Sequence, residues 1–119
     1  MKRGRSTRKP TKAHELRFAG IKEGGCIVAY MRGLGWVPAE IHHMTVGSRH
    51  GQKRRGHDYT CGLNPYSHRG ELFNDLSLEQ CRRLFGPSYA ISPKEFREMY
   101  PDDRLLEAQD MLLKQLGFV

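Results

Sequence analysis

Two extended segments on either side of a glycine-rich, cationic loop constrain the fold of this chain more than any other feature. Residues 36–43 read as an extended segment, and Pro38 within it favours an edge strand or the start of a strand. Residues 58–63 look like the returning strand. Between them, residues 47–57 contain three glycines and four lysines or arginines, a composition typical of a loop. The sequence therefore predicts a two-stranded antiparallel ribbon with a long cationic tip.

Helix signals follow the ribbon. Asn64 is a good N-cap and Pro65 suits the first helical position, so we expect a short helix that includes His68. Residues 77–80 resemble a capping box, and the helix that they begin should end at Phe85, before Gly-Pro. These signals predict that a short helix follows the second strand directly.

The other segments complete a mixed fold. We expect a short helix over residues 13–19, ending at the next glycine, and a strand or knuckle over residues 24–31. Another helix should occupy residues 92–100. Asp102 or Asp103 should cap the last helix, whose leucines recur at helical spacing. The expected class is α+β, with several short helices around the ribbon.

Length and composition favour one domain. With 119 residues and 38% hydrophobic content, the chain supports a modest core. Residues 1–13 read as a disordered basic arm, and residues 14–119 as a single folded domain. No apolar run resembles a signal peptide or approaches the roughly 18 residues of a spanning helix. The expected location is the cytoplasm of the cell that makes the protein.

The net charge of +7 and the pI near 9.6 indicate an acidic partner. Nucleic acid is favoured over an anionic membrane surface. Residues 1–12 and 49–55 are basic runs without an acidic residue. Either run alone can be a solvated surface, but two of them near a histidine cluster favour phosphate contacts. The candidate nucleic-acid-binding residues are Lys2, Arg3, Arg5, Arg8, Lys9, Arg49, Lys53, Arg54, Arg55 and Arg69.

The cysteines carry no recognisable site. Cys26, Cys61 and Cys81 are widely spaced and form no Cys-x-x-Cys pair. A disulfide framework is therefore not expected, and all three should be buried, inert thiols.

The histidines carry the chemistry. His42 and His43 end the first extended segment, and His68 lies in the helix that follows the ribbon. Imidazole serves both as a metal ligand and as a general base near neutral pH. Strand alternation would place His42 and His43 on opposite faces, and the helix would project His68 back toward them. Any one of these rings can instead be a core histidine. His14 and His50 should be exposed and without an individual role, although the loop that carries His50 can contact phosphate.

Residues 38–43, 56–60 and 62–70 together resemble the recombination-enhancement, RecA-dependent nucleases of phages, a branch of the HNH superfamily. The resemblance spans about residues 24–115. It implies a ββα-metal core and cleavage of DNA, double- or single-stranded, with a RecA filament as partner and no membrane. It also implies a divalent ion, Mg²⁺ or Mn²⁺, with Zn²⁺ and Ni²⁺ as alternatives in the same site.

The resemblance also implies roles for particular residues. His43 matches the general base, and His42 and His68 match the metal ligands. Asp58 matches the region of the asparagine that orients the base, unless the register slips to Tyr59 or the aspartate only caps a turn. His57 matches no motif position, and is expected to assist with metal or phosphate.

The chain departs from the family in one respect. Relatives carry Cys-x-x-Cys and Cys-x-x-His motifs that bind a structural zinc, whereas residues 26–29 and 64–67 here retain only Cys26. A structural zinc is therefore not expected. Two functions stay open: an HNH-type DNA endonuclease, and a non-catalytic DNA-binding recombination accessory protein that keeps the same fold.

Overall fold

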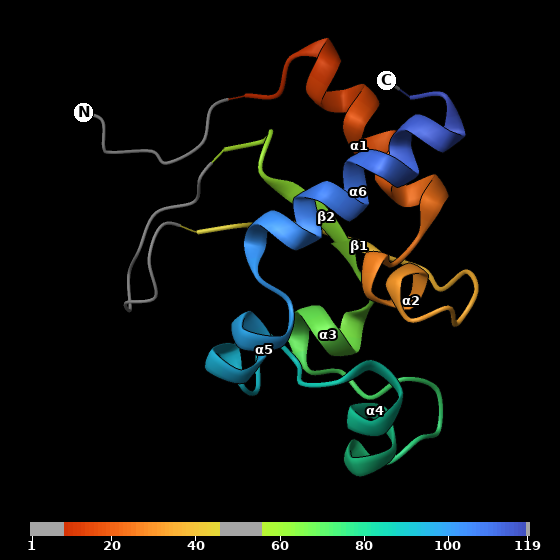
Figure 1. Ribbon diagram of the computed structural model, residues 1–119, viewed down its shortest axis with the longest axis vertical. Helices are drawn as coiled ribbons and strands as arrows, with labels where there is room; N and C mark the ends of the chain where they lie inside the picture. Colours follow the sequence, from red (N-terminus) through yellow and green to blue (C-terminus); the bar gives the residue numbers. More distant parts are fainter. Residues whose placement is uncertain (1–8, 46–55, 119) are drawn as a thin grey trace.

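The structure is a computed structural model that describes residues 9–45 and 56–118 (Figure 1). Six helices and two strands are assigned within these ranges. In chain order they are α1 (Lys12–Gly24), α2 (Ile27–Met31), β1 (Glu40–His43), β2 (Thr60–Leu63), α3 (Pro65–Arg69), α4 (Leu78–Phe85), α5 (Pro93–Met99) and α6 (Asp102–Leu116). Helices α1 and α6 cross beside the ribbon in the upper part of the view, and α3, α4 and α5 lie in the lower part (Figure 1).

The two strands form the predicted antiparallel ribbon, which confirms the α+β class. Glu40 pairs with Leu63 and His43 pairs with Thr60. The β2 strand is buried along its whole length, and its Gly62 N–H donates to the Gln109 side chain of α6 at 2.9 Å. The ribbon is therefore anchored to α6 through its second strand.

Helix α3 begins where the local signals predict. The Asn64 side chain accepts a hydrogen bond from the Ser67 N–H, and Pro65 occupies the first turn. Gly70 ends the helix in a left-handed conformation with φ of 81°, which glycine adopts without strain. The order strand, strand, helix thus places His68 one helical turn after the end of β2.

Two predictions about the first third of the chain are wrong. Residues 24–31 form no strand or knuckle, because Ile27–Met31 is helical and buries Ile27, Val28 and Ala29. A short apolar run is compatible with either structure, and only packing decides between them. Helix α1 does not end at Gly20 but continues to Gly24. At Gly20 an added Cβ would lie 2.5 Å from Leu113 Cδ2, so this glycine allows α1 and α6 to approach closely.

The ends of other helices also bear on the predictions. Helix α1 starts at Lys12 with Thr11 as its N-cap, and so takes in the last residues assigned to the basic arm. Residues 1–8 of that arm lie outside the described residues. The Ser77 capping box is confirmed, as is the end of α4 at Phe85. The N-cap of α6 is Pro101, so neither predicted aspartate caps that helix; both lie in its first turn, where the helix dipole favours negative charge.

The core lies between the ribbon and the surrounding helices. Its large members come from β2 and from five helices, α2 to α6: Ile27, Leu63, Tyr66, Phe85, Phe96, Leu105 and Leu113. All three cysteines are buried thiols, as predicted. Burial raises the pKa of the Cys61 thiol, which disfavours the reactive thiolate. None of the described helices has both the length and the apolar character needed to cross a membrane.

Replacing Gly62 with alanine should destabilise the ribbon. The new Cβ would lie 2.8 Å from Ile21 Cγ2, 2.9 Å from Ala39 Cβ and 3.0 Å from the Gly25 carbonyl oxygen. Overpacking of this kind typically costs about 1–3 kcal/mol. Urea unfolding followed by circular dichroism should show the loss, with Lys22→Ala as an exposed control. Equal midpoints for the two variants would contradict this packing.

Candidate functional site

The predicted histidines form two groups on opposite faces of β1. The ring of His42 lies 5.3 Å from that of His68 and 4.7 Å from that of Tyr89, centroid to centroid. His43 Nε2 lies instead 3.0 Å from His57 Nδ1. Neighbouring residues of a strand point to opposite faces, which explains the separation. We refer to these groups as the His42–His68 pair and the His43–His57 pair.

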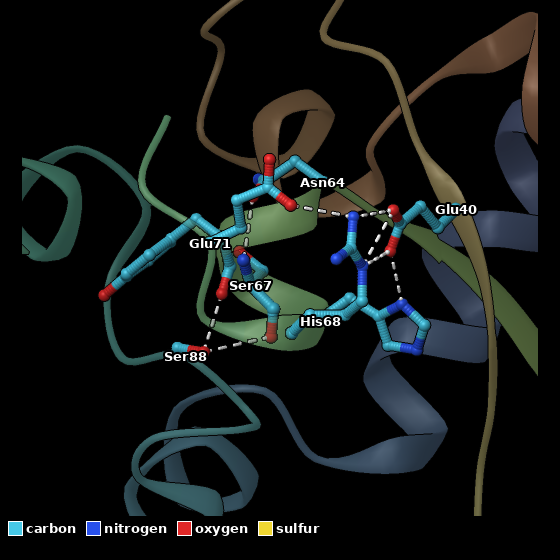
Figure 2. Close-up of polar contacts among 8 residues, drawn as sticks. Glu40, Asn64, Ser67, His68, Glu71 and Ser88 are labelled. Carbon is cyan, nitrogen blue, oxygen red and sulfur yellow. Dashed lines mark hydrogen bonds and ion pairs between the residues drawn. The ribbon is translucent and has the colours of Figure 1, made fainter. Parts of the chain in front are cut away.

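A carboxylate orients the His42–His68 pair. Glu40 precedes His42 by two residues and shares its face of β1, and its Oε1 lies 2.8 Å from His68 Nδ1 (Figure 2). Because an ionised carboxylate only accepts hydrogen bonds, His68 Nδ1 carries the proton and donates it. The lone pair of a neutral His68 then lies on Nε2. Histidine ligands of metal ions are commonly oriented in this way.

An arginine keeps Glu40 ionised. The Arg69 guanidinium donates to Glu40 through Nε and Nη2, with a shortest distance of 2.7 Å (Figure 2). These hydrogen bonds, with a smaller contribution from His68, lower the pKa of Glu40 to about 2 and outweigh the opposing effect of burial. Arg69 also contacts Glu71 at 2.9 Å. The guanidinium of Arg69 is therefore already paired with two carboxylates. Its role in binding nucleic acid stays a prediction.

The loop before α5 completes this side of the site. The Tyr89 N–H donates to the Ser67 carbonyl at 2.8 Å. The Ser88 hydroxyl donates to the Tyr66 carbonyl at 2.6 Å (Figure 2). These bonds attach the loop to α3, the helix that carries His68. The Tyr89 ring is thereby held against His42, which is only 5% exposed.

Helix α1 packs against the other pair. The Phe18 ring lies 6.0 Å from His43 and 5.5 Å from His57, in edge-on geometry. The His14 ring lies 5.0 Å from His57, and its Nε2 is 3.1 Å from Asp58 Oδ1. The expectation that His14 is exposed is wrong, because its side chain is only 21% exposed and meets two predicted site residues.

Arg17 ties the same face of α1 to the strand that follows His57. Its guanidinium donates to the Thr60 hydroxyl at 2.9 Å and to the Thr60 carbonyl at 2.6 Å. The Thr60 hydroxyl donates in turn to the His57 carbonyl at 2.8 Å. Positions 14, 17 and 18 share one face of a helix, so α1 supports the His43–His57 pair as a unit.

The remaining candidates are only partly described. Lys9 is exposed, and Asp58 is 78% exposed. The other basic candidates lie outside the described residues: Lys2, Arg3, Arg5, Arg8, Arg49, Lys53, Arg54 and Arg55. Within residues 9–45 and 56–118, no group of three histidine, cysteine or acidic side chains is arranged to hold a metal ion.

Fold and site together describe a small α+β protein with a histidine pair on each face of one strand. A family model described as recombination enhancement, RecA-dependent nuclease matches residues 10–114. The chain belongs to that family. Membership implies nuclease activity in recombination, on DNA and in dependence on RecA. Searches of curated proteins and of solved structures gave no match.

Proposed function

We propose that the protein is a metal-dependent DNA endonuclease of the HNH type. The observation that carries this proposal is the β1–β2–α3 unit, which brings His42 and His68 together while His43 directly follows His42. Such a unit supplies two imidazole ligands and a neighbouring base, the groups that hydrolysis of a phosphodiester requires. The family match supports the nuclease part of the proposal.

His42 and His68 are the residues that would hold the ion. An imidazole nitrogen binds a divalent ion at roughly 2.0–2.1 Å, so rings whose centroids lie 5.3 Å apart are close enough to share one. Glu40 directs His68 Nε2 toward this role by accepting the hydrogen bond of Nδ1–H. When bound, Mg²⁺, Mn²⁺ or a related ion supplies positive charge that polarises the scissile phosphate and offsets charge on the leaving oxygen.

His43 acts as the general base. Its Nε2 shares a hydrogen bond with His57 Nδ1, so one of these two atoms donates and the other accepts. Nδ1 of His43 can receive the proton of the attacking water when His43 Nε2–H donates in this bond and His57 Nδ1 accepts, and this is the tautomer that we propose. His57 orients the ring, and Asp58 and His14 hold the segment that carries His57.

The substrate is DNA, and the basic segments contribute phosphate contacts. The chain has a net charge of +7, and residues 1–12 and 49–55 are runs of basic sequence that contain no aspartate or glutamate. The family match is the observation that supports a role for RecA. The substrate that we propose is DNA held in a RecA filament.

Cleavage assays test the proposal directly. Supercoiled DNA and RecA-coated DNA are incubated with the protein and Mg²⁺, Mn²⁺, Zn²⁺ or Ni²⁺, with EDTA as the control. We expect strand breaks only when a divalent ion is present, and more of them on the RecA-coated substrate. Binding to DNA without cleavage under every ion would favour the non-catalytic accessory protein instead.

A further inference from the structure

We propose that Arg97 of α5 is a phosphate-binding residue that holds the DNA backbone beside the His42–His68 pair. The substrate class rests on the proposed function, but the anion-binding geometry can be examined without it. No feature of the local sequence singles out Arg97, which lies more than fifty positions from His42.

The guanidinium of Arg97 is fixed next to the site. Its Nη2 donates to the Thr45 hydroxyl at 2.8 Å and to the Tyr89 hydroxyl at 3.4 Å. Its central carbon lies 5.6 Å from the centroid of the Tyr89 ring, within the range of a cation–π contact. The same ring packs against His42 at 4.7 Å, so Arg97 and His42 share one aromatic neighbour.

Arg97 differs from several other arginines in its partners. Arg17, Arg69, Arg82 and Arg83 each form an ion pair with a carboxylate. Among the described residues, no carboxylate forms an ion pair with Arg97, and residues 1–8 and 46–55 contain no aspartate or glutamate. Arg97 is nevertheless only partly exposed, and its hydrogen bonds to Thr45 and Tyr89 are part-buried. A partly buried charge without an ion pair among the described residues favours an anion from outside the chain.

The free part of the guanidinium offers hydrogen-bond donors to a phosphate. Nε and Nη1 of Arg97 make no hydrogen bond to any residue that the structure describes, whereas Nη2 is held by the two hydroxyls. The free N–H groups point to different sides of the guanidinium, so phosphate oxygens would accept charge-assisted hydrogen bonds from them singly. Tyr89 is in turn attached to α3 through the Ser67 carbonyl, so His68 and Arg97 are positioned by one connected framework.

Bound in this way, Arg97 both places the DNA backbone and stabilises the charge that develops on the phosphate. Removing one preorganised donor of this type typically lowers kcat about 10²–10³-fold. Removing one phosphate contact reduces the slope of log affinity against log salt by about 0.9.

Arg97→Gln and Arg97→Lys test the inference, with Arg82→Gln as the matched control because Arg82 pairs with Glu95, a residue of the same helix as Arg97. DNA affinity is measured in EDTA over a range of salt, and kcat and KM are measured with metal. For Arg97→Gln we expect weaker binding, a slope reduced by about 0.9 and a lower kcat. Arg97→Lys should restore the slope but only part of kcat, because an ammonium on a flexible stem is not fixed beside the site as the planar guanidinium is. Arg82→Gln should change none of these.

An unchanged slope and affinity in Arg97→Gln would overturn the inference, as would an equal change in Arg82→Gln. If the wild type binds DNA but cuts it under no condition, the nuclease proposal fails while the slope still decides the role of Arg97. Should Arg97→Gln fail to fold, the wild type decides: titration with inorganic phosphate should shift the Arg97 Nε–H resonance in ¹⁵N NMR. The absence of that shift would also overturn the inference.

Discussion

Replacing His43 with alanine should lower kcat about 10²–10⁴-fold, the usual contribution of a general base. DNA affinity without metal should change little, because the ring lies 3.0 Å from His57 and is only partly exposed in the ribbon. The variant should also keep the ribbon, since β1 is held by backbone pairing with β2. The loss should therefore fall on the chemical step and not on binding.

Single-turnover cleavage and a DNA-binding isotherm in EDTA separate these effects. Added imidazole should restore part of the activity of His43→Ala, because it can occupy the space of the missing ring and accept a proton. A matched variant, His57→Gln, should lose less activity, since His57 only orients the base. Cleavage by His43→Ala at the wild-type rate would exclude His43 as the base.

Removing either ring of the His42–His68 pair should abolish most of the metal affinity. Loss of an outer partner alone typically costs about 10–100-fold in metal affinity, so Glu40→Gln should fall in that range and His42→Ala or His68→Ala should exceed it. Because both rings would hold one ion, the double variant should lose little more than either single variant.

Isothermal titration with Mn²⁺ measures these affinities, and His57→Ala provides a control from the opposite face of β1. That control should bind the ion as the wild type does, since His57 contacts His43 and not His68. Equal losses in His57→Ala and His68→Ala would mean that the ion is held elsewhere. Unchanged affinity in His42→Ala would remove that residue from the ligand set.

The parts of the fold that could be predicted are those determined by local chemistry. Asn64 with Pro65, and the capping box at Ser77, satisfy the free N–H groups of a helix start within a few residues. The strands of the ribbon were also predictable, because a turn-rich loop separates two extended segments. Residues 27–31 were not, since their helical state depends on burial among distant elements.

The same distinction applies to the site. Alternation along a strand predicted that His42 and His43 would separate, and by the same period-two rule Glu40 could have been recognised as a neighbour of His42. His14 and Arg97 could not have been found in this way. His14 reaches Asp58 across more than forty positions, and Arg97 reaches Thr45 across more than fifty. Only packing of α1 and α5 brings them to the ribbon.

One contact in the interior affects how the protein can be handled. The buried Asn64 amide donates to the Cys26 sulfur at 3.2 Å, joining the start of α2 to the start of α3. This link is a hydrogen bond between two side chains, and the caps of α3 are likewise hydrogen bonds between protein atoms. Treatment with a chelator should therefore yield a folded apoprotein, so that ions can be returned one at a time to an intact scaffold.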